Sequence, residues 1–492
     1  MTPSGTTSTT AAAPPARNSG AQPAWEVLLP AAAAPARRRG RALQEALREA
    51  VRSGRLTAGT RLPSSRALAQ DLGVSRGLVT EAYEQLVAEG YLRSDRGSGT
   101  WVGGAVRTEQ TAPSPGPHGL AAPAAPGSGT VADFRPGTPD LSLFPRAAWA
   151  AAQRTVLSEL PHSALGYPDP RGLPELRSAL AAMLSRRRGV VADPDRLVVC
   201  SGVAQAATLL GFVLRARGHH SVGVEDPGSP EHSRLFAATG LDTLWLPLDE
   251  EGLRPEPLAR SGTRAVVVTP SHQFPSGIAW SAERRGMLLE WARSVDGYVC
   301  EDDYDGDFRY DRAPVGALQG LDPERVVYTG SVSKSLAPGL RLGWMVLPAS
   351  LIEEIVERKR TMDLGHPALD QAALAHLVTS GGYDRQLRRC QRAYRERRDA
   401  LLAALDEHFP GTTVTGIAAG LHVIAYLPAR YGPARRFLEA AANAGVALRA
   451  LEEYGTARPT DGAVRLVVGY AHLTPTTIAA GIGRVAEALD AR

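Results

Sequence analysis

Two stretches rich in proline, alanine, glycine, serine and threonine divide this chain of 492 residues and limit what it can fold into. The first covers residues 1–36 and the second residues 104–130. Neither has apolar residues at regular spacing, so neither buries enough apolar surface to offset the entropy lost on ordering. We therefore predict a disordered tail, a short module over residues 37–103, an extended linker and a long domain over residues 131–492.

The composition excludes other classes of protein. With 43% hydrophobic and 22% charged residues, the chain is too apolar for a disordered protein. No run of apolar residues approaches the length of about 18 that a membrane span needs. The three cysteines, Cys200, Cys300 and Cys390, are too widely spaced for a disulfide framework or a Cys-x-x-Cys metal site. We expect a cytoplasmic protein that binds neither a membrane nor a metal ion.

Apolar residues recur at helical spacing in three places within the short module. The first helix is predicted to end at Gly54 and the second at Gly73, because glycine readily takes the conformation that closes a helix. Ser75 is a typical N-cap for the third helix. Two short helices joined by a tight turn, with two strands after Gly90, predict a winged helix-turn-helix. The apolar positions are Leu43, Leu47, Val51, Leu68, Leu72, Val79, Tyr83 and Leu86.

The short module carries a strong positive charge. It holds twelve arginines and no lysine against seven acidic residues, so 12 − 7 gives a net charge of +5. An excess of this size fits the phosphates of DNA, and the polar face of the third helix fits base edges in a major groove. The alternative is a module that mediates protein contacts, with its arginines on a solvated face. The candidate DNA contacts are Ser65, Arg66, Ser75, Arg76, Thr80, Arg96 and Gly97.

Five motifs in this module resemble the GntR-type winged helix-turn-helix. They cover the module from end to end, and the resemblance implies a double-stranded DNA operator as its partner. The motifs are Leu62–Arg66, Leu72–Arg76, Ala82–Leu86, Glu89–Leu92 and Gly97–Thr100.

Three short apolar segments of the long domain alternate with stretches of helical length. The segments are Val266–Pro270, Tyr298–Asp302 and Arg325–Thr329. This alternation is typical of an α/β fold, in which crossover helices join parallel strands. Because ligands of such folds bind beyond the carboxyl ends of the strands, we expect the site there.

The chain has only two lysines, Lys334 and Lys359. Lys334 follows Ser331 and Ser333 and precedes Arg341, so an amine stands among hydroxyls and a guanidinium. The amine can form an imine with an aldehyde, and the other groups suit a phosphate. Pyridoxal 5′-phosphate requires both, so it is the predicted cofactor. Lys359 lies in a highly charged segment and is predicted to sit on a charged helix face without a chemical role.

Acidic residues follow the second apolar segment. Asp302 and Tyr304 are two apart, so the strand pleat would project both the same way and turn Asp303 and Asp305 elsewhere. A carboxylate keeps a buried pyridine nitrogen protonated, and a phenol suits the ring oxygen. The alternative is a metal cluster, because all the acidic side chains from 301 to 307 offer oxygen ligands, although their order fits no EF-hand loop. These residues are Glu301, Asp302, Asp303, Asp305 and Asp307.

A glycine turn, Cys200–Gln205, joins a further apolar segment to the start of a helix. The backbone amides of Val203 and Ala204, with the positive end of the helix, would face a phosphate there. Such a turn is a weak signal alone, and it gains weight beside Lys334 and Arg341.

The long domain resembles a fold type I aminotransferase over nearly its full length. Such a domain has a mainly parallel sheet in its large part and a smaller α/β subdomain at its C-terminus. A winged helix-turn-helix followed by this domain is similar to the MocR family of transcription regulators, which includes the GabR and PdxR types. The motifs that carry the resemblance are Gly166–Gly172, Thr269–Gly277 and Ser331–Arg341.

The resemblance implies a role for each candidate residue. Lys334 would bind the cofactor's aldehyde, Asp302 its pyridine nitrogen and Tyr304 its ring hydroxyl. Tyr167 would reach the partner's site in a homodimer whose winged domains are exchanged head to tail. Arg465 would clamp the carboxylate of an amino acid effector. The phosphate would be held by Val203, Ala204, Ser331, Ser333 and Arg341.

Two positions depart from the aminotransferase pattern. Ser229 stands where an aromatic residue commonly stacks on the cofactor ring, and the lost contact amounts to about 1 kcal/mol. Phe274 stands in place of an asparagine near the ring hydroxyl. His232 either substitutes as a planar group or is an exposed helix residue.

We predict a transcription regulator that senses an amine, an amino acid or pyridoxal 5′-phosphate itself through imine exchange at Lys334. The alternative is a catalytically active aminotransferase with an accessory DNA-binding domain, because Lys334 could also move a proton. A third hypothesis is a repressor whose long domain binds no cofactor and only dimerises.

Overall fold

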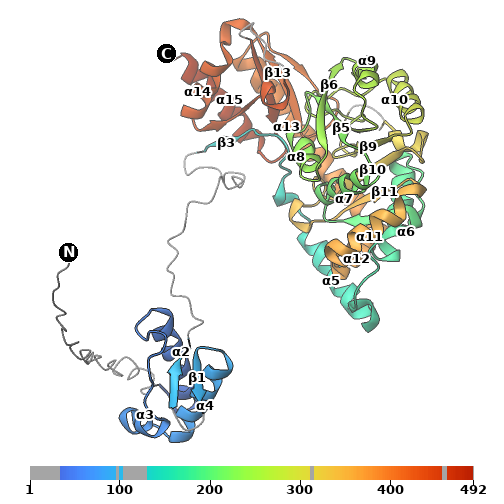
Figure 1. Ribbon diagram of the computed structural model, residues 1–492. Helices are drawn as coiled ribbons and strands as arrows, with labels where there is room; N and C mark the ends of the chain where they lie inside the picture. Colours follow the sequence, from blue (N-terminus) through green and yellow to red (C-terminus); the bar gives the residue numbers. More distant parts are fainter. Residues whose placement is uncertain (1–33, 96–98, 104–129, 311–314, 457–462, 491–492) are drawn as a thin grey trace, which may run out of the picture. The chain divides into compact units, whose positions relative to one another are not determined.

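The structure is a computed structural model (Figure 1) that describes residues 34–95, 99–103, 130–310, 315–456 and 463–490. Its contacts divide the chain into two compact units, residues 1–123 and residues 124–492. Most of the predicted tail and linker, together with Arg96 and Gly97, lies outside the described residues. No described helix is both long enough and apolar enough to cross a bilayer.

The described part of the first unit is the predicted winged helix-turn-helix. Ser64 and Ser75 cap the second and third helices, because each hydroxyl accepts a hydrogen bond from the backbone N–H three residues on. Gly73, with φ of 62°, closes the second helix. Apolar side chains from all three helices and both strands form the core. The elements are α2 (Arg39–Arg52), α3 (Ser65–Leu72), α4 (Arg76–Ala88) and the antiparallel pair β1 (Leu92–Asp95) and β2 (Gly99–Val102).

Eight strands of the second unit form one mixed sheet in the order β4-β11-β10-β9-β8-β5-β6-β7. The three segments predicted as strands are β8, β9 and β10, which are neighbours and run parallel. β11 runs antiparallel to both β10 and β4, so the carboxyl ends of β4, β9 and β10 share one edge with the amino end of β11. The strands are β4 (Leu197–Cys200), β5 (Ser221–Asp226), β6 (Asp242–Asp249), β7 (Gly252–Leu253), β8 (Ala265–Val268), β9 (Tyr298–Asp302), β10 (Val326–Ser331) and β11 (Gly343–Val346).

Helices cover both faces of this sheet (Figure 1). Val198 and Cys200 pack in one core with α7, α8 and α11, whereas Leu197 and Val199 pack in the opposite core with α6 and α12. Alternate residues of β4 therefore pack into the cores on opposite faces of the sheet, as expected for a sheet buried on both sides. The helices are α5 (Arg146–Glu159), α6 (Pro174–Arg188), α7 (Val203–Ala216), α8 (Pro230–Ala237), α9 (Pro255–Arg260), α10 (Ala282–Ser294), α11 (Ile352–Asp363) and α12 (Ala368–Thr379).

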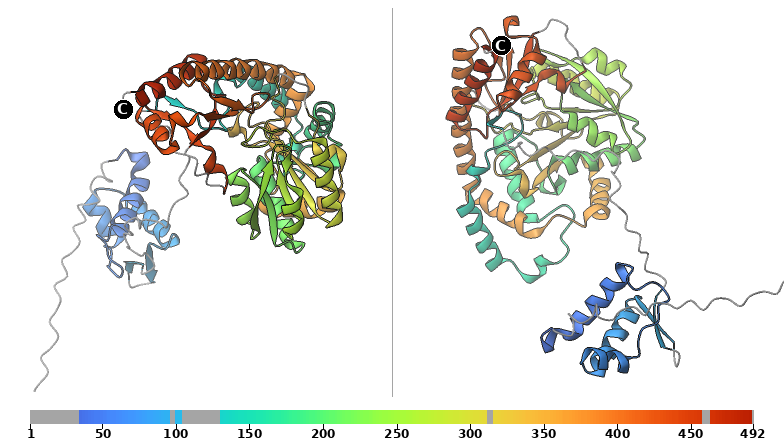
Figure 2. Two further views of the ribbon diagram at one scale, coloured as in Figure 1. Left: turned by 90° about the horizontal axis from the view of Figure 1, so that it is seen from above. Right: turned by 90° about the vertical axis from the view of Figure 1, so that its left-hand side faces the viewer.

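A smaller sheet, in the order β12-β13-β16-β15, forms the C-terminal subdomain with three helices. The long helix α13 packs beside α15 (Figure 2). Leu466 and Val468 of β16 lie in the core with these helices, so Arg465 and its cross-strand partner Tyr426 face the other way. The elements are α13 (Gly382–His408), β12 (Thr413–Thr415), β13 (His422–Leu427), α14 (Ala434–Asn443), β15 (Arg449–Ala450), β16 (Val464–Gly469) and α15 (Pro475–Asp490), and a further parallel pair is β3 (Ala132–Asp133) with β14 (Val446–Ala447).

Candidate cofactor site and nucleic-acid interface

Lys334 lies in the turn that follows β10, at the edge of the sheet where the strands β4, β9 and β10 end. Its Nζ donates a hydrogen bond to the Gly137 carbonyl oxygen at 2.5 Å. Burial lowers the pKa of Lys334, against the opposing charges of Asp305 and Asp302. A lowered pKa increases the share of neutral amine, which is the form that attacks an aldehyde.

The other lysine was wrongly predicted to occupy a charged helix face. Lys359 is fully buried in α11, and its Nζ lies 2.6 Å from Asp363 Oδ2, one helical turn away. Gln205 donates to the same Asp363 oxygen at 2.6 Å. This ion pair explains how an ammonium group is buried so close to the sheet. Of the two lysines, only Lys334 lies in the turn that follows β10, since Lys359 is paired within α11.

Asp302 is the last residue of β9, and its two carboxylate oxygens have different surroundings. Oδ2 accepts a hydrogen bond from His232 Nε2 at 2.9 Å, whereas Oδ1 is buried and has no partner among the described residues. Burial acts to lower the pKa of His232, but the bond to Asp302 and the charge of Glu225 outweigh it, so the pKa is raised. His232 is therefore a buried partner of Asp302, and the alternative of an exposed helix residue is wrong.

Tyr304 lies beyond the end of β9, where the strand alternation no longer holds. Its hydroxyl is 3.0 Å from His272 Nδ1, and Asp305 Oδ2 is 2.8 Å from the same nitrogen. Asp305 therefore shares a partner with Tyr304, contrary to the prediction that it faces elsewhere. Burial raises the pKa of Tyr304 above its ordinary value, so the phenol keeps its proton.

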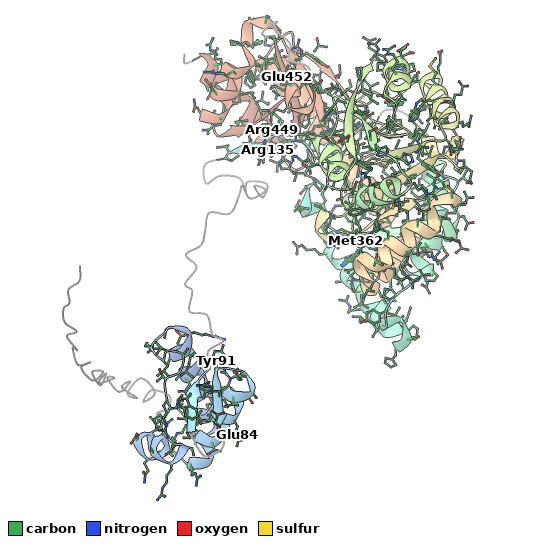
Figure 3. All side chains as sticks on the ribbon, viewed as in Figure 1. Glu84, Tyr91, Arg135, Met362, Arg449 and Glu452 are labelled. Atoms are coloured by element: carbon green, nitrogen blue, oxygen red, sulfur yellow. The ribbon has the colours of Figure 1, made fainter. Side chains whose placement is uncertain are left out.

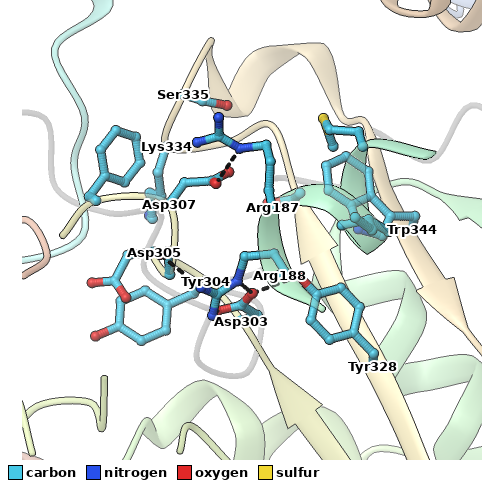
Figure 4. Close-up of a pocket in the computed structure, with 15 residues that line it drawn as sticks. Arg187, Arg188, Asp303, Tyr304, Asp305, Asp307, Tyr328, Lys334, Ser335 and Trp344 are labelled. Atoms are coloured by element: carbon cyan, nitrogen blue, oxygen red, sulfur yellow. Dashed lines mark hydrogen bonds and ion pairs between the residues drawn. The ribbon is translucent and has the colours of Figure 1, made fainter. Parts of the chain in front are cut away.

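The remaining carboxylates of this acidic run point to separate partners. Asp303 Oδ2 pairs with Arg188 Nε at 2.6 Å, and both side chains are buried. Figure 4 shows this pair between Tyr304 and Tyr328. Glu301 accepts hydrogen bonds from the backbone amides of Leu318 and Gln319. Carboxylates committed in this way do not converge on one point, which argues against the metal-cluster alternative.

The turn after β4, which contains Gly202, lies against the guanidinium of Arg341. Gly202 has φ of 77°, and a side-chain carbon there would lie 2.9 Å from Arg341 Nη2, so only glycine leaves the guanidinium its place. The first backbone bond of α7 runs from Ala206 to Gly202, so the amides of Val203 and Ala204 precede it and point out of the helix start. Ser331 lies at the end of β10, on the same sheet edge, and its Oγ accepts a hydrogen bond from the Ser333 N–H at 3.3 Å.

Phe274 packs among aromatic rings. Its ring lies edge-on to Tyr304 at 5.9 Å and to Tyr454 at 5.4 Å, and 5.1 Å from His422. The benzyl ring offers no hydrogen bond where the asparagine of the aminotransferase pattern would offer one. Ser229 directly precedes α8, and the neighbouring Gly228 N–H donates to the Tyr454 carbonyl at 2.7 Å. The C-terminal subdomain thus contacts the turn that carries Ser229.

Arg465 lies on the face of the small sheet that also carries His422, and its Nη1 is 3.4 Å from Glu452 Oε1. Both side chains are about one-fifth exposed, at 19% and 22%. Glu452, labelled in Figure 3, lies in the C-terminal subdomain. Tyr167 is not part of the small sheet. It lies on the loop before α6 and is 89% exposed in this single chain.

The candidate DNA contacts that the structure describes lie on α3, at the cap before α4 and on α4. Arg66 and Arg76 are exposed, Thr80 is half-buried, and Ser65 is half-buried at the start of α3. The Ser75 hydroxyl is engaged as the cap of α4, because it accepts from the Leu78 N–H at 3.4 Å. The guanidinium groups of Arg61, which precedes α3, and of Arg93 in β1 each lie 5.9 Å from the ring of Trp101 in β2.

Both parts of the chain match known families. The family described as "Aminotransferase class I and II" matches residues 132–485, and "Bacterial regulatory proteins, gntR family" matches residues 40–102. The chain is 34% identical to the probable rhizopine catabolism regulatory protein MocR of Rhizobium meliloti, over 91% of this chain and 93% of that protein. The chain belongs to the MocR family of transcription regulators.

Other proteins similar to this MocR-type regulator are also transcription regulators or aminotransferases. The pyridoxine biosynthesis transcriptional regulator PdxR of Corynebacterium glutamicum is 33% identical, over 78% of this chain and 82% of that protein. The structure of Pyrococcus horikoshii kynurenine aminotransferase, solved in complex with PMP, covers 74% of this chain and 92% of its own, with a TM-score of 0.65 and 28% identity. The cofactor of the aminotransferase-like domain is accordingly pyridoxal 5′-phosphate, and the winged module binds DNA.

The residues of the site fit this cofactor. Asp302 Oδ1, which has no partner among the described residues, can accept a hydrogen bond from a pyridinium N–H. The turn at Gly202 and the guanidinium of Arg341 offer hydrogen-bond donors to a phosphate. When bound, the cofactor supplies an aldehyde that captures an amine and a ring that draws electrons from it. Asp302, oriented by His232, would hold the ring nitrogen proton, while Tyr304 keeps its own proton for the ring oxygen.

Sequence reasoning missed several members of the site. His272, which hydrogen-bonds to Tyr304 and Asp305, lies in the motif Thr269–Gly277, but no residue spacing indicated a role for it. Glu225 is buried, and burial raises its pKa to about 7. The Gly137 carbonyl, which accepts from Lys334, had no signal at all, because any residue carries a carbonyl. His232 was noticed only as one of two alternatives.

Proposed function

We propose that this regulator senses an amine, an amino acid or pyridoxal 5′-phosphate itself at Lys334 and adjusts its affinity for operator DNA in response. The observation that carries the proposal is the position of Lys334, whose amine lies at the sheet edge bonded to the Gly137 carbonyl and within reach of the charges of Asp305 and Asp302. By imine exchange the effector's amino group takes the place of the Lys334 amine, which is released. Arg465 would hold the carboxylate of an amino acid effector.

The contact between Lys334 and Gly137 offers a route from this exchange to the rest of the chain. Gly137 belongs to the segment between β3 and α5, close to the start of the second unit. A released Lys334 amine can donate to the Gly137 carbonyl, whereas an amine held by the cofactor cannot keep the same bond. Each state of Lys334 thus favours a different restraint on this segment, as coupling between two sites requires.

The proposal includes a homodimer. Tyr167 is the most exposed of the large apolar side chains in the described residues, at 89%, and Leu165, two residues before it, is 60% exposed. A tyrosine in such a position fits a contact that only a second chain can supply. We propose that it reaches the partner's cofactor site and that winged modules are exchanged head to tail, which gives an operator with two half-sites.

One experiment tests the sensor. The full-length protein with pyridoxal 5′-phosphate is reduced with borohydride, and peptide masses locate the adduct. We expect it on Lys334, none on Lys359, and none in Lys334→Ala. Unreduced samples of the same proteins are titrated with operator DNA, with and without candidate amines, and the amines should shift the affinity of the wild type but not of Lys334→Ala. An adduct at neither lysine would contradict the proposal.

Turnover separates the sensor from a working aminotransferase. Phe274 places an aromatic ring where an amide would assist the ring oxygen, which counts against efficient transamination. We expect slow or no conversion of 2-oxo acids in a steady-state assay. Turnover at ordinary enzymatic rates without sequence-specific DNA binding would favour the enzyme.

A further inference from the structure

A second cavity, of about 430 Å³, opens on the surface of the aminotransferase-like unit. It shares no lining residue with the pocket of Figure 4 that holds Lys334. Its volume lies in the range of cavities that hold small ligands, about 300–1,000 Å³. No carboxylate lines it among the described residues. Its arginines are Arg309, Arg385, Arg388, Arg392 and Arg395.

Four of these arginines form a row on the long helix α13. Arg385, Arg388, Arg392 and Arg395 are spaced by three, four and three residues, so they follow one another along one face of the helix. All four are exposed. Like charges on successive turns repel one another and destabilise the helix slightly. A row of this kind is therefore explained better by an anion that it binds than by the stability of the fold.

Two nearby acidic residues are paired with arginines outside the row. Asp384 pairs with Arg186 at 2.9 Å, and its other oxygen lies 3.2 Å from Arg187. Asp307 pairs with that same Arg187 at 2.9 Å. Glu396 is exposed and forms no ion pair with the described residues.

The two central arginines are the most available. Arg388 and Arg392 make no hydrogen bond or ion pair within the described part of the chain, whereas Arg395 donates to the Tyr310 carbonyl. Two guanidinium groups with all their donors available present a bidentate site to an oxyanion.

We infer that this cavity is a second ligand site, which binds a small anion with several phosphate groups. Arginine matches the geometry of phosphate oxygens, and more than one phosphate is needed to span a row of charges on three turns. The concave shape favours a small molecule over the backbone of a DNA duplex, which would lie along an open surface. Inorganic oligophosphates and nucleoside polyphosphates share this chemistry.

The test uses the full-length protein with its cofactor at an ionic strength near 0.15 M, where unspecific attraction is screened. Sodium tripolyphosphate and ATP are titrated separately by calorimetry. The cavity variant is Arg388→Gln with Arg392→Gln. The control is Arg260→Gln with Arg436→Gln, which removes the same charge at exposed positions outside the cavity. Equal melting temperatures of the two variants show that each is folded.

We expect tripolyphosphate to bind at one site per chain, at least tenfold more weakly to the cavity variant and within twofold of wild type for the control. ATP that binds tenfold more tightly than tripolyphosphate would identify a nucleotide, and equal or weaker binding an inorganic oligophosphate. No binding, or equal binding to both variants, would overturn the inference. So would a loss of operator affinity in the cavity variant without any loss of tripolyphosphate binding, since the arginines would then serve DNA.

Discussion

Lys334 Nζ donates to the carbonyl oxygen of Gly137, which lies 197 residues earlier in the chain. This bond joins the amine expected to capture the cofactor to the turn that follows β3. Gly137 has φ of 96°, and a side-chain carbon there would lie 4.0 Å from the Lys334 nitrogen, so the two groups pack closely. The backbone near Gly137 is accordingly placed to respond to whatever the lysine binds.

Hydrogen exchange should detect that response. In the protein loaded with pyridoxal 5′-phosphate, adding an effector amine should release Lys334 and restore its bond to Gly137. A hydrogen bond contributes about 1 kcal/mol, so amides in residues 131–140 should exchange about fivefold more slowly. Mass spectrometry of peptides from this segment measures the change, and Lys334→Ala should show none. An identical slowing in that variant would separate the segment from the lysine.

His232 should set how firmly the cofactor is held. His232→Leu removes the donor to Asp302 Oδ2 and leaves a buried carboxylate oxygen without its partner, which costs about 1.5–3 kcal/mol. Part of this free-energy cost destabilises the complex with the cofactor relative to the free protein. The dissociation constant for pyridoxal 5′-phosphate should therefore rise about tenfold or more. Equilibrium dialysis followed by absorbance measures it. His232→Gln, which keeps a donor, should lie closer to wild type, and unchanged binding in His232→Leu would refute the role.

The order of elements was accessible from sequence, because it depends on local patterns. The Ser75 cap, the glycine that ends α3 and the apolar segments of β8, β9 and β10 all show in the chain itself. The side-chain partners were not accessible. His232 reaches Asp302 across 70 residues, and Lys359 is buried because Asp363 and Gln205 surround its charge. Asp305 was misplaced because β9 ends before it.

The buried Glu225 should make stability depend on pH. Burial raises its pKa to about 7 from 4.5, so the folded state holds its proton more tightly than the unfolded state. Stability is then complete below about pH 4.5 and falls as the pH rises to about 7. In Glu225→Gln no such loss occurs, so its stability relative to wild type should rise across this range by about 2–3 kcal/mol. Urea unfolding at pH 5 and pH 8 measures the change, and equal stability of Glu225→Gln relative to wild type at both pH values would contradict it.

Glu452 should compete with an effector for Arg465. The two side chains are 3.4 Å apart and partly exposed, so their interaction is worth about 0.2–1 kcal/mol. Glu452→Gln should therefore bind an amino acid effector up to about fivefold more tightly. Titration of the cofactor's absorbance band measures the affinity. The neighbouring Glu453, which pairs with Arg449, provides the control Glu453→Gln. Weaker binding in Glu452→Gln would mean that Glu452 contacts the effector's amino group instead.

Arg76 should contribute to operator recognition. It is the first residue of α4, it is exposed, and the Ser75 cap beside it fixes the start of the helix. Arg76→Ala should lower the affinity for the specific operator by about 1–3 kcal/mol and reduce the preference over unrelated DNA. Arg55→Ala removes an equally exposed charge from the loop after α2 and should weaken both DNAs alike, and only slightly. Fluorescence anisotropy at two salt concentrations separates the cases, because a phosphate contact changes the salt slope whereas a base contact changes the preference. Full sequence preference in Arg76→Ala would remove α4 from the role of recognition helix.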